Sequence, residues 1–242
     1  HTFVTKPELD YVTAAYDEGY GPDEDRTVTH RRSILFLKPD VFIVTDFLLP
    51  SDDASHTYES AFHVDTDSVS VDSLNLRTEN TKGGNLAILT IGPQGTAVDV
   101  VEAREEPFVQ GWMPKHGDIT KCLPVPTPVY TFSGAGKLAI TYVMVPVAPG
   151  AEAPVTGIRP LSVRAGDLAC SAGVLTMADG KEIYFAQREP GDSRMAVGEG
   201  ETDAESGALF ADGSGRVDRI LLANGTGVWG DDSLLSPGDY IV

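Results

Sequence analysis

Residues 30–49, HRRSILFLKPDVFIVTDFLL, contain two runs of apolar and β-branched residues on either side of a Lys-Pro-Asp turn at 38–40. Runs of this length and composition predict two antiparallel strands that form a hairpin. The second run begins with four consecutive apolar residues, 41–44, so its strand is expected to be covered on both faces. The hairpin therefore predicts the middle of a sheet layer.

Short β-rich runs continue outward from this hairpin. The 25 Gly and 16 Pro residues recur every few positions and leave little room for helices. The expected strands are 9–16, 30–38, 41–49, 57–64, 84–91, 96–103, 127–132, 137–146, 168–176, 181–187 and 218–223. Hairpin turns are expected at 134–137 and 178–180, and a turn at 224–226. The predicted fold class is all-β, a large two-layer antiparallel β sandwich with few or no helices.

We expect one sandwich domain over residues 1–242. The segment 149–157 is typical of a surface linker and would divide a larger part, 1–150, from a smaller part, 156–242. Residues 189–207 are rich in Gly, Asp, Glu and Ser and predict a mobile loop with few strand contacts. The chain starts with His1 and has no signal peptide, so we expect a processed or excised piece of a longer protein.

The formal net charge is −18. A surface with this charge repels nucleic acid and anionic membranes, so neither is an expected partner. It also repels a polyanionic sugar unless positive charge is concentrated locally, and solubility is the simplest reason for it. No apolar run reaches the ~18 residues of a membrane span. Cys122 and Cys170 could pair or remain as two buried thiols, and neither belongs to a metal-binding Cys motif.

Two histidines near one aspartate form a candidate metal site. His30, Asp46 and His63 lie in neighbouring β-rich runs, and two imidazoles with one carboxylate are a normal zinc set. A three-residue loop at 38–40 pairs Arg32 with Asp46 and puts His30 on the same face as Asp46. A two-residue loop would put them on opposite faces, and the sequence allows either.

His63 is harder to place than His30. If residues 50–55 formed a hairpin loop, Asp46 would lie opposite Glu59. His63 would then be four residues further along, roughly 13 Å away at about 3.3 Å per residue. The zinc set therefore needs a longer loop or a non-adjacent strand. Ordinary hydrogen-bonded sheet histidines are the alternative.

Three side chains are candidates for contact with a substrate. Arg32 could bind a carboxylate or sulfate, although an ion pair within the protein is the commoner fate of such a residue. Trp112 and His116 lie in a segment that predicts a loop suited to sugar stacking, and a Trp packed on a sheet edge is the alternative. No nucleophile elbow, phosphate loop or dinucleotide fingerprint occurs, and no carboxylate pair stands out. No catalytic residue is therefore predicted in this chain.

The segment 30–49 resembles the β-sandwich signature of heparinase II/III-type polysaccharide lyases, in which an HRR strand leads through a KPD turn to a strand that ends in Asp. Residues 61–63 (AFH) resemble the Phe-His pair of that family, and weaker similarities occur at 9–21, 111–128 and 221–226. The resemblance implies the C-terminal β sandwich of an enzyme whose N-terminal α/α toroid is missing here. Such enzymes cleave uronic-acid-containing polysaccharides by β-elimination, with a Tyr/His pair on the toroid for proton transfer.

The resemblance also implies a structural zinc ion held by His30, Asp46 and His63. Some relatives have a histidine two residues before the first ligand, where it helps to neutralise the uronate, but this chain has Val28 there. The implied partners are an acidic polysaccharide and the toroid domain, and the implied location is periplasmic or secreted. Whether the chain is an enzyme by itself is uncertain, and we expect it to be inactive without the toroid. The alternatives are a non-catalytic carbohydrate-binding module and a structural domain that braces a neighbour.

Overall fold

The computed structural model describes residues 1–242 except 21–22, 116, 199, 230–239 and 242. Strands without any helix make up the regular structure of these residues, so the all-β prediction is confirmed. Nothing in the described part is a helix that could cross a membrane. The strands are β1 (Thr2–Thr5), β2 (Leu9–Tyr16), β3 (Val28–Leu37), β4 (Val41–Pro50), β5 (Ser55–Ala61), β6 (Val69–Asp72), β7 (Asn75–Thr78), β8 (Asn85–Ile91), β9 (Ala97–Val101), β10 (Trp112–Lys115), β11 (Asp118–Pro124), β12 (Thr127–Ala135), β13 (Leu138–Val147), β14 (Val155–Pro160), β15 (Val163–Arg164), β16 (Cys170–Met177), β17 (Glu182–Arg188), β18 (Met195–Val197), β19 (Gly200–Thr202), β20 (Ser206–Ala211), β21 (Val217–Ala223), β22 (Val228–Trp229) and β23 (Tyr240–Ile241).

An eight-stranded antiparallel sheet, the central sheet, has the order β1-β2-β3-β4-β13-β8-β7-β6. Its middle is the hairpin of β3 and β4, in which Leu37 pairs with Val41 and Arg32 pairs with Asp46. The loop is therefore the three-residue one, and it places His30 on the same face as Asp46 because alternate side chains of a strand share a face.

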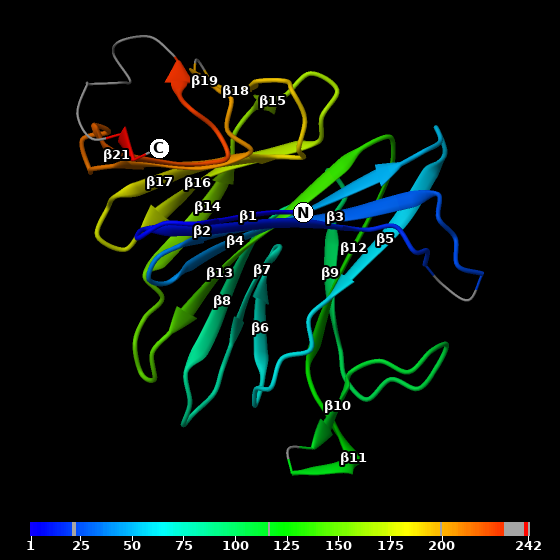
Figure 1. The fold of residues 1–242 in the computed structure, drawn as a ribbon. Coiled ribbons are helices and arrows are strands. Elements are labelled where there is room, and N and C mark those ends of the chain that lie inside the picture. The colour runs from blue at the N-terminus through cyan, green and yellow to red at the C-terminus, as the bar shows by residue number, and fades with distance from the viewer. Residues whose placement is uncertain (21–22, 116, 199, 230–239, 242) are drawn as a thin grey trace.

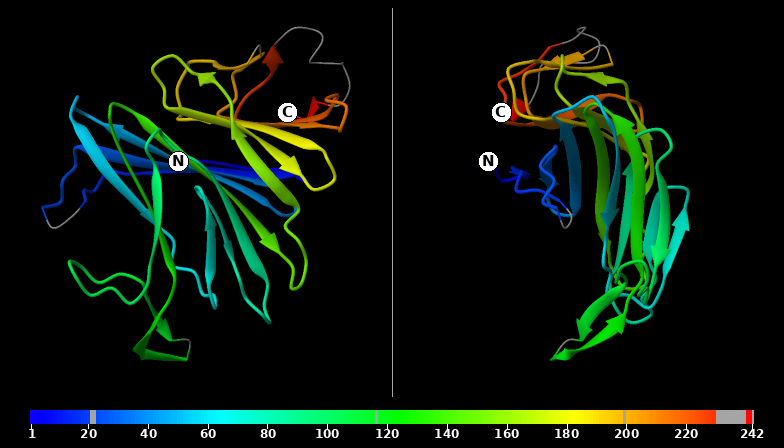
Figure 2. Two further views of the ribbon diagram at one scale, coloured as in Figure 1. Left: turned by 180° about the vertical axis from the view of Figure 1, so that it is seen from behind. Right: turned by 90° about the vertical axis from the view of Figure 1, so that its right-hand side faces the viewer.

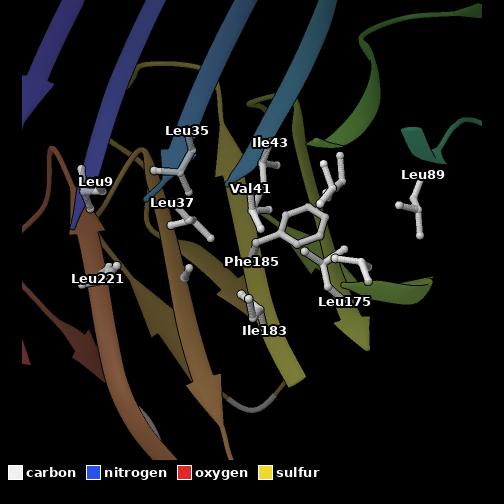
Figure 3. Packing of buried hydrophobic residues seen from close by; sticks show 14 of the residues in the cluster. Leu9, Leu35, Leu37, Val41, Ile43, Leu89, Leu175, Ile183, Phe185 and Leu221 are labelled. Carbon is white, nitrogen blue, oxygen red and sulfur yellow. The ribbon is translucent and has the colours of Figure 1, made fainter. Parts of the chain in front are cut away.

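One face of the central sheet packs on the C-terminal sheet, which has the order β14-β16-β17-β20-β21-β23 (Figure 1). Figure 3 shows the apolar side chains between the two sheets, with Leu35 and Ile43 from the central sheet facing Leu175 and Phe185. All four are almost fully buried. This seam is the larger part of the hydrophobic core.

Hydrogen-bonded polar side chains cross the same seam. The Thr45 and Thr141 hydroxyl oxygens lie 2.8 Å apart, and Thr141 donates to Ser171 Oγ at 2.7 Å. Thr45 also donates to the Gln187 side-chain carbonyl. Because Ser171 and Gln187 belong to β16 and β17, these bonds connect the two sheets directly.

The opposite face of the central sheet packs on a small sheet with the order β5-β12-β9. The side chains between them include Val44 and Leu48 of β4, Tyr142 of β13, and Tyr130 and Phe132 of β12. The central sheet is thus covered on both faces, as the apolar run at 41–44 predicts. The sandwich is confirmed, but the described strands form three stacked layers where two were predicted.

Two small sheets lie outside these layers. The β10–β11 pair is at the end of the molecule far from the C-terminal sheet (Figures 1 and 2). A four-stranded sheet, β15-β18-β19-β22, packs beside the C-terminal sheet. The prediction of a mobile loop at 189–207 is wrong, because β18, β19 and the start of β20 lie there and Met195 is fully buried.

The turn at 224–226 does not close a hairpin, since β22 pairs with β19 and not with β21. The predicted linker at 149–157 contains the first residues of β14, and Val155 is buried in the core. By contrast, the turns at 38–40 and 178–180 lie between consecutive strands that are paired with each other. The hairpin predicted at 134–137 is wrong, because β12 extends to Ala135 and pairs with β5 and β9, whereas β13 pairs with β4 and β8. Local turn signals therefore fail where the next strand pairs elsewhere.

Phe185→Ala should lower the free energy of unfolding by about 3–5 kcal/mol, because it leaves a ring-sized cavity in the seam. Phe3, which is 68% exposed, is the matched control, and Phe3→Ala should change stability by no more than about 0.5 kcal/mol. Urea unfolding followed by circular dichroism measures both. Equal effects of the two substitutions would contradict the packing described for the seam.

Candidate functional site

A pocket of about 410 Å³ opens between β3 and β4 of the central sheet and β5 of the small sheet. We call it the β3–β5 pocket. Its polar lining includes Tyr20, Asp25, His30, Arg32, Asp46 and His56. Apolar residues such as Leu48, Phe132 and Ile140 form the rest of the wall. It combines an apolar body with a few convergent polar groups, as binding sites commonly do.

The strand pattern explains why polar groups gather here. Even-numbered residues of β4 face the small sheet, and Val44 and Leu48 lie in the apolar cluster between the sheets. Asp46 is the carboxylate between them, 3% exposed. Its partner in the register, Arg32 on β3, therefore points to the same face.

Arg32 and His30 satisfy the buried carboxylate of Asp46. Arg32 Nε donates to Oδ1 at 2.6 Å and Nη2 donates to Oδ2 at 2.7 Å, a bidentate arrangement. His30 Nε2 lies 2.8 Å from Oδ1. Burial opposes ionisation, but the hydrogen bonds from Arg32 and His30 outweigh it and hold the pKa of Asp46 below its ordinary value. The carboxylate is therefore charged and fully partnered.

A hydrogen bond extends this arrangement to the surface. His30 Nδ1 lies 3.0 Å from the hydroxyl oxygen of Tyr20. When Nε2 donates its proton to Asp46, Nδ1 accepts from the Tyr20 hydroxyl, which fixes both the tautomer and the ring. Burial raises the pKa of Tyr20, so the phenol is neutral and able to donate. A continuous hydrogen-bonded network thus runs from Arg32 through Asp46 and His30 to Tyr20.

His56 of β5 lines the pocket on the opposite side. Its Nε2 lies 2.7 Å from Asp52 Oδ1. The hydrogen bond to His56 is the main reason that the pKa of Asp52 lies below its ordinary value. Both residues are therefore engaged with each other at the pocket rim.

The predicted zinc ligands do not come together as a set. His30 and Asp46 are in contact, but His63 follows the end of β5 and is exposed. The neighbouring Phe62 packs on Tyr142, inside the cluster between the sheets. Among the described residues, no group of three or more His, Cys, Asp or Glu side chains is arranged to hold a metal ion. With both Asp46 oxygens on Arg32, the side chains as arranged do not fit the zinc ion that the resemblance implies.

The predicted substrate contacts lie in different places. Arg32 lines the pocket, but its guanidinium is paired with Asp46. Trp112 is half-buried in β10, where its indole Nε1 donates to the Arg104 carbonyl at 3.3 Å, and it does not line the pocket. His116 lies outside the described residues. The two cysteines are unpaired, with Cys122 exposed and Cys170 partly buried.

Tyr20 and His56 are pocket residues that the sequence did not single out as site residues. Tyr20 reaches His30 because its backbone pairs with Asp25 in an isolated bridge within the β2–β3 connection. Irregular connections have no hydrophobic period, so no sequence signal predicts this position. His56 faces the pocket from β5, which pairs with β12 and not with β4, whereas the Glu59 side chain lies on the opposite, exposed face of β5.

One family model matches an N-terminal part of the chain. Residues 3–121 match the family model described as "Heparinase II/III-like, C-terminal". The chain is similar to the heparan sulfate lyase HepC from Pedobacter heparinus, with 19% identity over 81% of this chain and a TM-score of 0.53. It is also similar to a heparinase III, with 10% identity over 78% of this chain and a TM-score of 0.58. No curated protein matches the chain.

The identities with these solved structures are low, so the likeness concerns the fold. The chain spans only 27% of the length of either structure. What those longer proteins do therefore applies to this chain only as a proposal. All the polar residues that line the β3–β5 pocket lie within the 3–121 segment that the family model matches.

Arg32→Gln should lower the free energy of unfolding by about 2–4 kcal/mol, because it leaves Asp46 charged and buried with His30 as its remaining partner. We expect a loss of stability near the lower end of this range, because the Arg32 side chain is 42% exposed to solvent. Arg26, which pairs with Glu18 at 3.5 Å on the surface, is the matched control, and Arg26→Gln should cost less than about 1 kcal/mol. Denaturant midpoints measure both, and equal losses would contradict the special role of Arg32.

Zinc content tests the fit of the metal site. We expect no stoichiometric zinc in the purified protein, an unchanged melting temperature in the presence of a chelator, and an effect of His63→Ala on stability below about 0.5 kcal/mol. Inductively coupled plasma mass spectrometry and thermal unfolding measure these quantities. One zinc ion per chain, lost on His63→Ala, would mean that His63 joins His30 and Asp46 after all.

Proposed function

Since residues 3–121 of this chain match the model of a heparinase II/III-like C-terminal domain, we propose that the chain is the β-sandwich part of a polysaccharide lyase. The substrate class is a uronic-acid-containing polysaccharide, and the reaction is β-elimination. The family match carries this proposal, and the β3–β5 pocket within the matched segment supports it.

The chemistry of β-elimination divides the work between two domains. A base removes the proton at C5 of the uronate, and the 4-linked oxygen leaves as the double bond forms. Negative charge builds up on the uronate carboxylate in the transition state and must be neutralised. In the proposal, the proton transfers come from a Tyr/His pair on an N-terminal domain, and this chain forms one wall of the cleft.

The contribution of this chain is binding and orientation. Arg32 is bound to Asp46, so in this arrangement it is not free to neutralise a uronate. Positive charge for the uronate is then expected from the other domain. The partners in the proposal are an acidic polysaccharide and that N-terminal domain, in a secreted or periplasmic protein.

A carbohydrate-binding module is the second candidate function. It is favoured by two half-exposed tyrosines, Tyr16 and Tyr20, which lie edge to face at 5.3 Å beside a polar pocket. Aromatic faces next to hydrogen-bonding groups suit a sugar ring. In that case the chain would bind saccharide without any elimination, whether or not another domain is present.

Ultraviolet absorbance of the unsaturated product separates these functions. The chain alone should give no absorbance increase with a uronic-acid polysaccharide, and the chain produced together with the N-terminal domain should give one. Elimination by the chain alone, or none with both domains, would contradict the proposal. Saccharide binding without elimination in either form would support the binding module, and neither property would leave a bracing domain.

A further inference from the structure

We propose that the N-terminal domain docks on the free face of β1, β2 and the β3–β4 hairpin. The apolar side chains of this surface are Phe3, Val12, Phe36 and Phe42, and we call it the Phe3 face. The proposal rests on the proposed function in that it requires an N-terminal domain, and it adds the surface that this domain covers.

The pairing of the strands places these side chains on one side of the central sheet. Phe3 on β1 pairs with Val12 on β2, and Val12 pairs with Ile34 on β3. Two residues further along β3, Phe36 pairs with Phe42 on β4. Cross-strand partners and alternate residues of a strand point to the same side of a sheet. Since Ile34 packs toward the small sheet, the whole Phe3 face is on the side of the central sheet opposite the C-terminal sheet.

The small sheet covers only part of that side. The apolar cluster between the central and small sheets includes side chains of β3 and β4 but none from the described residues of β1 or β2. Among the described residues, none of the four side chains of the Phe3 face belongs to a hydrophobic core cluster. Phe3 is 68% exposed and the other three are partly exposed, whereas Tyr11, which points toward the C-terminal sheet, is fully buried. Strands β1 and β2 are thus packed on one face and open on the other.

The composition of the Phe3 face is that of a contact between proteins. The rings of Phe36 and Phe42 are stacked in parallel, with their centroids 4.1 Å apart. An ion pair between Lys38 Nζ and Asp10 Oδ1, at 2.9 Å, lies beside them, because Asp10 pairs with Phe36. An aromatic centre with a polar rim is typical of protein interfaces, and a contiguous exposed apolar patch marks such a site.

Charge argues against a second copy of this chain as the occupant. The second copy would also have a formal charge of −18, so the two copies would repel each other. The Phe3 face therefore fits a different partner.

Connectivity favours the N-terminal domain. A domain that precedes this chain is joined to it just before β1, which is the edge strand of the central sheet and carries Phe3 (Figure 1). Tethering at that point gives a high effective concentration at the Phe3 face, so a small apolar contact is enough. The family model that matches is described as C-terminal, and the chain spans only 27% of either similar structure. Both observations agree with a further domain in the same polypeptide.

A domain on the Phe3 face would border the β3–β5 pocket. Along β2, Tyr16 is four residues beyond Val12 on the same face, roughly 13 Å away at about 3.3 Å per residue. Tyr16 pairs with His30, which lines the pocket. The pocket therefore opens beside the docked domain, and its mouth becomes part of the cleft between the two domains.

Oxidative footprinting of the protein with both domains tests the Phe3 face. Hydroxyl radicals oxidise accessible phenylalanine rings, and mass spectrometry gives the rate for each residue. Phe108, which is 49% exposed and lies in the connection between β9 and β10, is the matched control. Phe3 is the more exposed of the two in this chain, yet it should be oxidised about fivefold more slowly, because the centre of an interface is buried.

Two results of the footprinting would overturn the Phe3 face. The first is a rate for Phe3 equal to or above that for Phe108. The second is protection of Phe3 that disappears when the protein is diluted, because a second copy would then be the occupant.

The affinity of separated domains tests the same surface by substitution. A protease site between the domains allows them to be cut apart, and analytical ultracentrifugation measures their association. Phe3→Glu should weaken it by about tenfold, since it places a charge in an apolar contact, and Phe108→Glu should change it by no more than about twofold. Both positions are exposed in this chain, so neither substitution should unfold it, and circular dichroism checks this. Equal effects of the two substitutions, or unsubstituted domains that separate once they are cut, would contradict docking on the Phe3 face.

The elimination assay keeps this surface and the proposed function apart. Elimination by the protein with both domains, together with rapid oxidation of Phe3, would overturn the Phe3 face and leave the lyase proposal standing. Slow oxidation of Phe3 without any elimination would support the Phe3 face and contradict the lyase proposal.

Discussion

The burial of β4 on both faces is the constraint on which the rest of the structure depends. The C-terminal sheet covers one side of this strand and the small sheet covers the other. Both its odd-numbered and its even-numbered positions must therefore be largely apolar. Every polar group that β4 carries must also find a partner inside the protein, because water cannot reach it. Thr45 and Asp46 are the two such side chains, and each has two partners.

These two residues show how different the two faces of β4 are. Thr45 is neutral and connects the central sheet with the C-terminal sheet. Asp46 is charged and sits where the layers separate enough to leave a pocket. A neutral hydroxyl needs one neighbouring oxygen, but a buried carboxylate needs a cation. The candidate site therefore exists because a charge on a doubly covered strand requires Arg32 and His30 beside it.

The sequence predicted what depends on neighbouring residues and missed what depends on distant ones. The apolar run at 41–44 and the turn at 38–40 were sufficient for the hairpin and for the double coverage of β4. The predicted contact of His30 with Asp46 followed from one of the two loop lengths that the sequence allowed, and the structure has that one.

The errors have a common physical origin. The partner of β5 is β12, more than 60 residues further along the chain, and no local signal encodes such pairing. The third layer and the sides of the pocket depend on it. The strands β18 and β19 within 189–207 were missed because each is only three residues long and has Gly-rich and acidic neighbours. Pairing within a small sheet, not composition, orders them. Tyr20 reaches the site through an irregular connection.

The threonine and serine hydroxyls in the seam have a mechanical consequence. Leucine and isoleucine side chains tolerate a sideways slip of one layer over another, since dispersion forces have little directionality. Hydroxyl groups at 2.7–2.8 Å do not, because a shift of an ångström breaks them. These hydrogen bonds therefore fix one alignment of the two sheets, whereas apolar contacts alone would allow several.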